Sequence, residues 1–223
     1  MSIQDQPPVA PAFALEDLRL WVPSSTTQAL DAKRLFDIAV SLALIVLLLP
    51  VLAGITLAVA VESRGPVLFC QRRTGMGGRI FAMFKFRSMR VMENGAEVVQ
   101  ATQNDPRVTR VGRTLRATSL DELPQLFNVL SGEMSLVGPR PHAVAHDHYY
   151  GARIANYAVR QKAKPGMTGW AQVNGARGET PQLRHMQARV DLDAWYVEHH
   201  SFLLDLKILA KTPLEVLKRR NAC

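Results

Sequence analysis

Residues Ile38 to Val61 read IAVSLALIVLLLPVLAGITLAVAV, a run of 24 residues without a charged side chain. A straight helix of this length would reach about 36 Å, enough to cross the roughly 30 Å hydrocarbon core of a bilayer. Pro50 divides the run into two halves, each only about 18 Å long as a helix. The run therefore predicts a membrane segment, either as one spanning helix or as two shorter helices around a break.

Basic residues flank this apolar run on both sides: Lys33 and Arg34 before it, and Arg64, Arg72, Arg73 and Arg79 after it. The positive-inside rule would keep both flanks on the cytoplasmic side. A proline in the middle of a helix removes a backbone hydrogen bond and favours a kink or a break. We therefore expect a re-entrant helix-break-helix that enters one leaflet and returns, with a single spanning helix as the alternative, because spanning helices also tolerate proline.

The apolar run divides the chain into three expected parts. Residues 1–32 are rich in proline and serine and are expected to form a loosely ordered extension. Residues 33–62 form the membrane-inserted segment, and residues 63–223 form a cytosolic domain. In that domain, the apolar residues on either side of a glycine-rich stretch at 75–78 predict a small β-hairpin.

Helical patterns then follow at 109–130 and 181–199. An amphipathic surface helix is expected at 202–220, interrupted at Pro213. The predicted fold class is a helix-rich α/β fold.

Composition limits the class of partner. The chain has 223 residues, 48% of them hydrophobic, and 27 Lys and Arg against 19 Asp and Glu give a net charge of +8. This balance excludes a disordered chain. Two cysteines, Cys70 and Cys223, cannot form a disulfide framework and favour a reducing, cytosol-facing environment. The positive charge suits nucleic acid, an anionic membrane surface or phosphorylated substrates.

Asp121 and Glu122 form the most informative pair of polar residues. With Ser119 three residues before Glu122, the segment could be a helix-capping box. Four arginines precede it at a spacing of three residues, so several could share one helix face: Arg107, Arg110, Arg113 and Arg116. Cations beside carboxylates at a helix start suit a phosphate site. An ionised Asp121 there is expected to keep a low pKa and could attack phosphorus.

Two further motifs have a defined shape. Pro139 and Pro141 restrict the backbone around Arg140, and a rigidly presented arginine suits bidentate contact with phosphate. Residues 164–175 contain three glycines and a proline, which indicate an irregular loop. The cluster His142, His146 and His148 lacks a matching set of metal ligands, so these side chains are expected at the polar surface.

Taken together, these motifs resemble one family, the bacterial sugar transferases of the monotopic phosphoglycosyl transferase type, in the minimal catalytic form. The resemblance runs from about Lys33 to about Lys218 and rests on these segments: Lys33–Asp37, Lys85–Met89, Ser119–Gln125, Leu136–Pro141, Lys164–Gly175 and Leu204–Lys207. One position departs from the family, because Leu49 precedes Pro50 where a serine is often found. Leu49 cannot satisfy a carbonyl freed by the bend.

The resemblance implies a monotopic enzyme at the bacterial inner membrane, resting on the cytosolic face of the inner leaflet. Its donor would be a UDP-sugar, its acceptor polyprenyl phosphate (undecaprenyl phosphate) and its cofactor Mg²⁺. It would release UMP and begin a lipid-linked glycan such as an exopolysaccharide, O-antigen or glycoprotein glycan. The loop at 177–180 is similar to that of members that use hexose donors.

The resemblance also implies a role for each matching residue. Asp121 would be the nucleophile that forms a covalent phosphosugar intermediate, and Glu122 its partner, with both carboxylates as metal candidates. The expected substrate-binding cations are Lys85, Arg87, Arg116, Arg140 and Arg177.

Two other functions compete with this interpretation. The first is a membrane-tethered nucleic-acid-binding module, in which Phe81, Phe84 and Phe86 would stack on bases beside neighbouring cations. The second is a non-catalytic scaffold anchored by one spanning helix. The family interpretation, which predicts no nucleic-acid partner, gives Asp121 and Glu122 a role that the other two do not.

Overall fold

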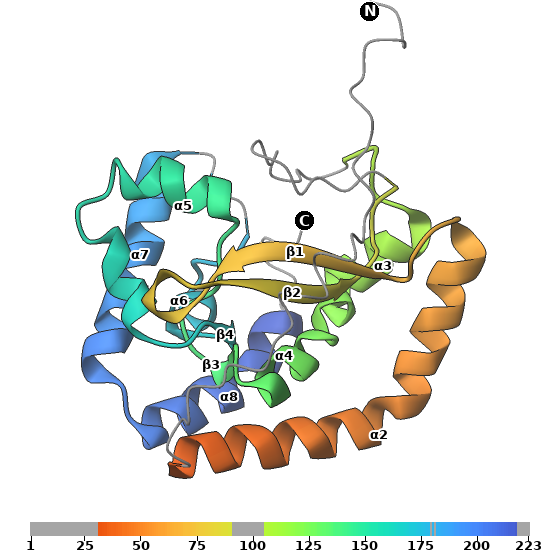
Figure 1. Ribbon diagram of the computed structural model, residues 1–223, viewed down its shortest axis with the longest axis horizontal. Helices are drawn as coiled ribbons and strands as arrows, with labels where there is room; N and C mark the ends of the chain where they lie inside the picture. The colour runs from red at the N-terminus through yellow and green to blue at the C-terminus, as the bar shows by residue number, and fades with distance from the viewer. Residues whose placement is uncertain (1–30, 91–104, 179, 181, 218–223) are drawn as a thin grey trace, which may run out of the picture.

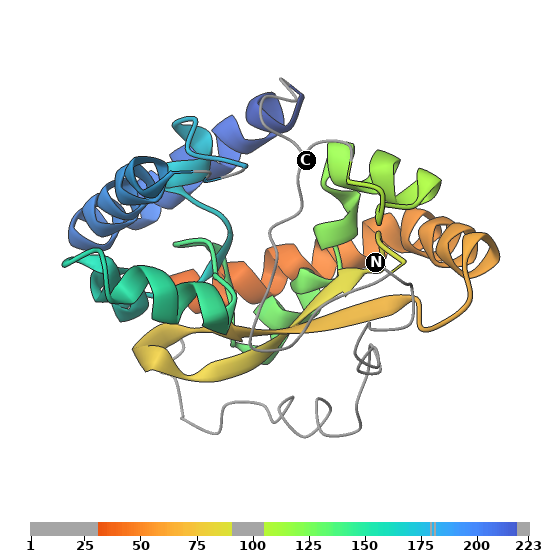
Figure 2. The same ribbon diagram turned by 90° about the horizontal axis from the view of Figure 1, so that it is seen from above.

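The computed structural model describes residues 31–90, 105–178, 180 and 182–217. A β-hairpin of β1 (Leu68–Thr74) and β2 (Ile80–Phe86) crosses the middle of the molecule. Helix α4 (Gln125–Ser131) lies between this hairpin and the long helix α2 (Ala32–Glu62), as Figures 1 and 2 show. The predicted helix-rich α/β fold with a small hairpin is therefore confirmed.

The remaining elements surround this centre. Helix α3 lies at one end of the hairpin, and helices α5 and α7 lie at the other (Figure 1). The bounds of the remaining helices and strands are as follows: α3 Arg110–Thr118, β3 Ser135–Val137, α5 Val144–Gly151, β4 Gly166–Thr168, α6 Trp170–Val173, α7 Leu183–His199 and α8 Phe202–Leu217. Short 3₁₀ turns are η2 (Met76–Gly78), η3 (Leu120–Glu122) and η4 (Tyr157–Lys162).

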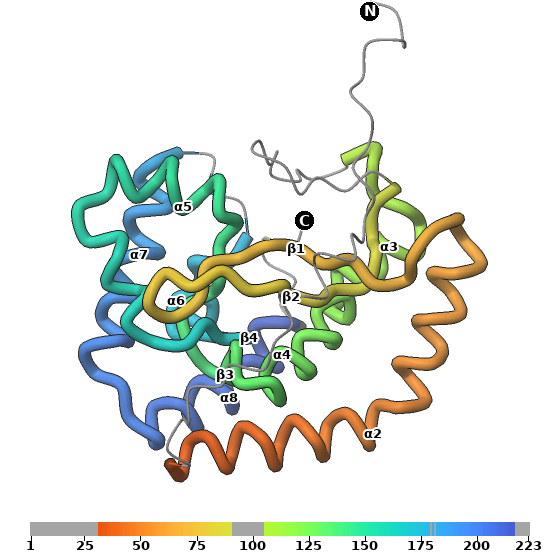
Figure 3. The backbone as a smooth tube through the Cα atoms, viewed as in Figure 1, coloured from red at the N-terminus to blue at the C-terminus, as the bar shows by residue number. Residues whose placement is uncertain are grey.

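Helix α2 is continuous through Pro50 but bent. It begins after Asp31, whose side chain accepts a 2.7 Å hydrogen bond from the amide of Arg34 as an N-cap. Its N-terminal and C-terminal parts run in clearly different directions, as the tube in Figure 3 shows. Pro50 lies inside the helix and accounts for the bend, because it donates no hydrogen bond and its ring crowds the preceding turn. The break that we expected at Pro50 is therefore a bend in a continuous helix.

One side of α2 packs on the rest of the molecule along both parts of the helix. Phe36 and Leu44 contact the main core, which includes Phe81, Leu126 and Leu136. In the C-terminal part, Ile55 and Val59 are buried in a second cluster with Phe86 and Leu115. The other side carries exposed apolar residues: Leu42, Val46, Leu47, Leu49, Leu57 and Val61. Within the described residues, α2 is the one helix long and apolar enough to cross a membrane.

Polar contacts fix both ends of α2 to the same domain. Near its start, the Arg34 guanidinium donates to the carbonyls of Val129 (2.5 Å) and Leu130 (2.7 Å). Near its end, the buried Arg87 guanidinium donates to the carbonyls of Pro66 (2.5 Å) and Ser63 (2.6 Å). Arg87 therefore holds the end of α2 and the segment that follows it, and among the described residues its guanidinium makes no hydrogen bond to Asp121 or Glu122. Its expected role in substrate binding stays a prediction.

The hairpin has the predicted position, with an antiparallel register that runs from Leu68 opposite Phe86 to Thr74 opposite Ile80. Two of the three rings named for the nucleic-acid alternative are buried, since Phe81 keeps 5% and Phe86 3% of its surface exposed, while Phe84 is half-buried. Phe81 and Phe86 therefore do not form the stacking platform that this alternative requires.

Strands β3 and β4 form a short parallel pair, with Ser135 opposite Gly166 and Val137 opposite Thr168. The glycine-rich segment expected as an irregular loop supplies β4. Glycine is required here because the backbones meet closely: a Cβ on Gly138 would lie 2.2 Å from the carbonyl oxygen of Lys164. This contact places the loop that carries Arg140 against the glycine-rich segment at 164–175.

Two predicted helix boundaries are wrong. Residues 109–130 do not form one helix, because Ser119 adopts the left-handed conformation (φ 58°) and ends α3. Turn η3 follows, and α4 begins only after Pro124. Helix α8 is not interrupted at Pro213 and continues to Leu217.

Candidate active site

Asp121 and Glu122 lie in the turn between α3 and α4. This turn exists because Ser119 reverses the backbone after α3, and Pro124 sets the start of α4. The capping box suggested by the sequence is absent: the Ser119 side chain makes no cap, and its hydroxyl accepts a hydrogen bond from Arg177. The turn thus places two adjacent carboxyl groups beside a guanidinium from a distant loop.

Glu122 is held by two cations. Its Oε1 accepts a 2.8 Å hydrogen bond from Lys85 Nζ on β2. Arg140 donates to both carboxylate oxygens, with Nη1 at 3.0 Å from Oε2 and Nη2 on Oε1. Burial alone would raise the pKa of Glu122, but Arg140 and Lys85 hold it well below its usual range. Glu122 is therefore an ionised anchor that orients two cations.

Asp121 has a different environment. Its carboxyl group is buried, and the residue keeps only 6% of its surface exposed. Burial raises the pKa of Asp121, with Glu122 adding to the rise, while Lys85, Arg116 and Arg140 oppose it. The expected low pKa of Asp121 is therefore wrong, because desolvation outweighs the neighbouring cations. Within the described residues, this carboxylate accepts no hydrogen bond, although it interacts electrostatically with Lys85, Arg116 and Arg140.

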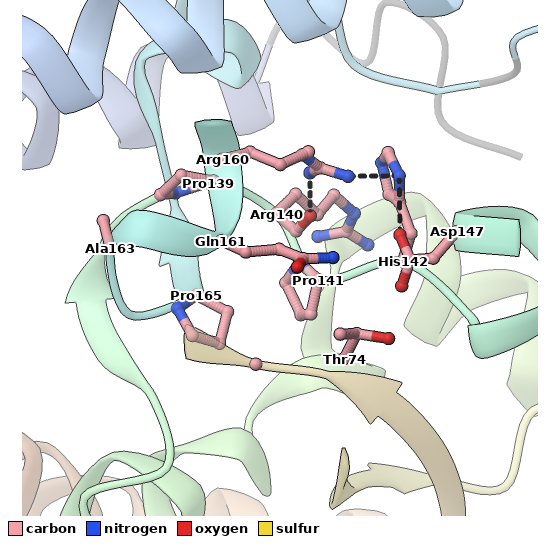
Figure 4. Close-up of a pocket in the computed structure, with 11 residues that line it drawn as sticks. Thr74, Pro139, Arg140, Pro141, His142, Asp147, Arg160, Gln161, Ala163 and Pro165 are labelled. Atoms are coloured by element: carbon pink, nitrogen blue, oxygen red, sulfur yellow. Dashed lines mark hydrogen bonds and ion pairs between the residues drawn. The ribbon is translucent and has the colours of Figure 1, made fainter. Parts of the chain in front are cut away.

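The backbone around Arg140 is fixed by a buried cluster, of which Arg160 and His142 are drawn with Arg140 in Figure 4. Arg160 donates to the Arg140 carbonyl and pairs with Asp193 at 3.0 Å. Arg73 Nη1 donates to the carbonyl of Pro141 at 3.2 Å. The cavity beside these groups holds about 20 Å³, room for a water molecule. The cluster therefore fixes the backbone from which the Arg140 guanidinium extends toward Glu122.

His142 belongs to this cluster and is not at the surface as expected. It keeps 5% of its surface exposed, and its Nδ1 lies 2.6 Å from the Tyr157 hydroxyl. Burial and the nearby arginines hold the pKa of His142 well below its usual range, which favours the neutral ring. His142 therefore has a structural role, through its contact with Tyr157 of η4, 15 residues later in the sequence.

Asn128 is a positioning residue that the sequence did not reveal. It is fully buried on α4, and its amide nitrogen donates to the Ala82 carbonyl at 2.7 Å. Its side-chain oxygen accepts from the amide of Phe84 at 3.0 Å. These two bonds hold β2 against α4 and so bring Lys85 to Glu122.

The other expected cations divide into two groups. Arg116 lies close enough to Asp121 to oppose the rise of its pKa. Arg177 lies close enough to both carboxylates for them to raise its own pKa. Burial lowers the pKa of Arg177. By contrast, Arg110 and Arg113 are exposed, and Arg107 pairs with Asp105 at 2.7 Å. The arginine series thus contributes Arg116 alone to the site.

Metal ligands are few. Within the described residues, no group of three or more His, Cys, Asp or Glu side chains could hold an ion. Mg²⁺ usually uses one or two carboxylates plus the phosphates of a substrate. The free carboxylate of Asp121, next to Glu122, fits that pattern.

Sequence comparison gives consistent relatives. The model of the bacterial sugar transferase family matches residues 28–219. The UDP-glucose:undecaprenyl-phosphate glucose-1-phosphate transferase of Escherichia coli (strain K12) is 56% identical over 180 residues, covering 81% of this chain and 39% of the relative. The Caulobacter vibrioides protein of the same name is 47% identical, covering 99% of this chain and 83% of the relative.

A relative that acts on another sugar is more distant. The UDP-N-acetylgalactosamine-undecaprenyl-phosphate N-acetylgalactosaminephosphotransferase of Aeromonas hydrophila is 38% identical, covering 83% of this chain and 43% of that protein. The chain spans about two fifths of the length of several of these relatives, including the one from E. coli.

Proposed function

The chain belongs to the bacterial sugar transferase family, and we propose that it transfers a sugar 1-phosphate from a UDP-hexose to polyprenyl phosphate, releasing UMP. The observation that carries this proposal is the 47% identity to the Caulobacter UDP-glucose transferase along nearly the whole chain. Glucose is the favoured sugar, since the relatives at 51–56% identity are also named for UDP-glucose. The lipid product would begin a lipid-linked glycan; a relative from Rhizobium is named an exopolysaccharide production protein.

Asp121 is proposed as the nucleophile. One carboxylate oxygen would form a bond to the sugar-side phosphorus of the donor, and the bond from that phosphorus to the bridging oxygen would break. UMP would leave with the electron pair. A phosphate oxygen of polyprenyl phosphate would then attack the same phosphorus and release the carboxylate. A desolvated carboxylate without a hydrogen-bonded partner supports this assignment, because little solvation must be removed before it attacks.

The cations would neutralise the phosphates. Lys85 and Arg140 are oriented by Glu122, and a preoriented cation stabilises developing negative charge without reorganising during the reaction. Arg116 and Arg177 would add charge around the diphosphate. Glu122 itself is occupied by these cations, which suits an orienting role better than attack on phosphorus.

Mg²⁺ is the proposed cofactor. Asp121 would hold it together with the phosphates of the donor, a ligand set that this ion accepts. Glu122, the other expected ligand, would bind the ion by exchanging a hydrogen bond from Lys85 or Arg140 for it. When bound, the ion would offset the repulsion between the carboxylates and the diphosphate.

The proposed location is the cytosolic face of the bacterial inner membrane, with residues 33–62 as a re-entrant segment and residues 63–223 as the catalytic domain. Support comes from α2, since its two ends bind the same folded domain through Arg34 and Arg87. A straight spanning helix would separate its ends by the thickness of the bilayer. The exposed apolar side of α2 would face lipid. The proposed extension at 1–32 lies almost wholly outside the described residues.

The test is isotope exchange in the absence of acceptor. Purified chain, Mg²⁺, UDP-glucose and labelled UMP should yield labelled UDP-glucose, because a covalent intermediate makes the first step reversible without polyprenyl phosphate. Adding polyprenyl phosphate should then give the lipid product. Complete transfer without exchange, and without an adduct trapped on Asp121, would replace the two-step route by direct transfer.

A further inference from the structure

A second, larger cavity of about 240 Å³ lies beside the catalytic pair. Its walls are mainly apolar and come from elements far apart in the sequence, including Leu44 of α2, Leu126 of α4, and Leu209 and Val216 of α8. Three charged residues, Glu122, Arg177 and Glu215, also line it. The cavity therefore joins an apolar space to the charged site.

The chemistry of the walls favours an apolar occupant. Two of the polar residues that line it bond to each other, with the Thr168 and Thr212 hydroxyls 2.8 Å apart. Gln172 Nε2 donates to the carbonyl of Met167, and its Oε1 is the one buried acceptor of this lining without a partner among the described residues. A uracil ring needs several donors and acceptors in place, whereas more than half of the lining residues are leucine, valine and methionine.

We propose that this cavity binds the isoprene units next to the phosphate of polyprenyl phosphate. The proposal rests on the proposed function and adds the place where its acceptor binds. Arg177 is the cation in the lining, and its charge matches the acceptor's phosphate. A ligand with a carbon chain and an anionic group thus matches a mainly apolar cavity whose lining includes the Arg177 cation.

The position of α2 supports the same occupant. Leu44 lines the cavity, while Val46 and Leu47, two and three residues later in the same helix, are among its exposed apolar residues. The rest of a long isoprenoid could therefore pass from the cavity along α2 into the lipid that we propose around that helix. A water-soluble nucleotide would gain nothing from this continuity.

The experiment is photocrosslinking of the full chain in lipid nanodiscs. The probe is a polyprenyl phosphate that carries a diazirine in the isoprene unit next to the phosphate. Labelled peptides should come from α4 or α8 at the cavity wall. Val216→Phe fills the cavity, so labelling should fall at least fivefold and the KM for the acceptor should rise about tenfold. Leu214→Phe is the matched control on α8, where Leu214 is 60% exposed and outside the lining; its labelling should match that of the wild type.

The outcomes separate this inference from the proposed function. Unlabelled polyprenyl phosphate should block labelling. Protection by UDP-glucose and not by polyprenyl phosphate would overturn the inference, as would equal labelling of both variants or labelling confined to the exposed side of α2. Exchange of UMP into UDP-glucose should be unchanged in Leu214→Phe, and a thermal melt that matches the wild type should show that Val216→Phe folds. Crosslinking requires no turnover, so it tests the cavity even if no sugar phosphate is transferred.

Discussion

Asp121 and Glu122 are neighbouring carboxyl groups to which the fold gives opposite properties. Glu122 is paired with Lys85 and Arg140 and is held in its ionised form. Asp121 is buried without such a pair, and its pKa is raised. Environments that move the pKa values of two neighbouring groups in opposite directions are typical of sites in which the two groups have separate roles. Here the difference supports Asp121 as the attacking group and Glu122 as the orienting one.

Asp121→Asn should abolish activity and still leave a stable protein. Loss of the nucleophile should lower turnover by about 10³-fold or more. The raised pKa means that the folded state binds this proton more tightly than the unfolded state. Stability therefore falls as pH rises from the ordinary aspartate pKa through the raised folded value. At pH 7 the variant should melt at the same temperature as the wild type or higher, by about 2–4 °C per kcal/mol relieved.

Thermal melts between pH 4 and pH 7.5 check this sign. The advantage of Asp121→Asn should shrink toward pH 4, where the wild-type carboxyl is protonated. Glu122→Gln is the comparison variant, and it should lose stability at pH 7 because two cations lose their partner. The loss should stay below the roughly 3–5 kcal/mol of a fully buried pair, because the Arg140 side chain is 31% exposed. An Asp121→Asn protein that melts well below the wild type at pH 7 would contradict the assignment.

At the scale of elements, local sequence patterns predicted the presence of helices and strands better than the positions of their boundaries. The hairpin followed from apolar residues around a glycine-rich turn, because such signals act between near neighbours. The boundary at Ser119 did not, since a non-glycine residue in the left-handed conformation has no clear sequence signal. The bend at Pro50 was half predicted: the proline marked the place, but packing of both parts of α2 keeps the helix continuous.

Gly138→Ala should disrupt the contact between the Arg140 loop and the glycine-rich segment. The new Cβ would lie 2.2 Å from the Lys164 carbonyl oxygen, so the backbone must move. A loss of about 1–3 kcal/mol or more is expected from such overpacking. Activity should fall with it, because Arg140 follows two residues later. Chemical denaturation in detergent measures the stability.

Gly54→Ala in α2 is the matched control. A Cβ there has no heavy atom within 4 Å, so alanine should fit and should stabilise the helix by about 0.5–1 kcal/mol. If the two alanine variants had equal stability, the close approach of Gly138 to residue 164 would be refuted.

At the scale of the whole molecule, the site depends on contacts that sequence patterns do not contain. The motifs identified Asp121, Glu122, Lys85 and Arg140, and the structure brings these four together. Their support by Asn128 and Arg160 was not predicted, because each acts on a backbone group 20 or more residues away. The contacts of Arg87 were not predicted for the same reason: its partners lie at the end of α2 and just after it, and only the fold brings them to Arg87.

Topology is the property in which the whole molecule takes part. Lys33 pairs with Asp205 of α8, and Arg34 binds carbonyls at the end of α4, while Arg87 holds the segment after α2. Pulling the two ends of α2 to opposite sides of a bilayer would break one of these sets of contacts and expose the clusters around Phe36 and Val59. Reporters fused before residue 1 and after residue 223 should therefore lie on the same, cytoplasmic side: green fluorescent protein should fluoresce at both ends, and alkaline phosphatase should be inactive at both. A periplasmic signal-sequence fusion of the phosphatase serves as the positive control. Active phosphatase at the N-terminal end, with fluorescence retained at the C-terminal end, would establish a spanning helix and require the contacts of Lys33 and Arg34 to be broken in the membrane.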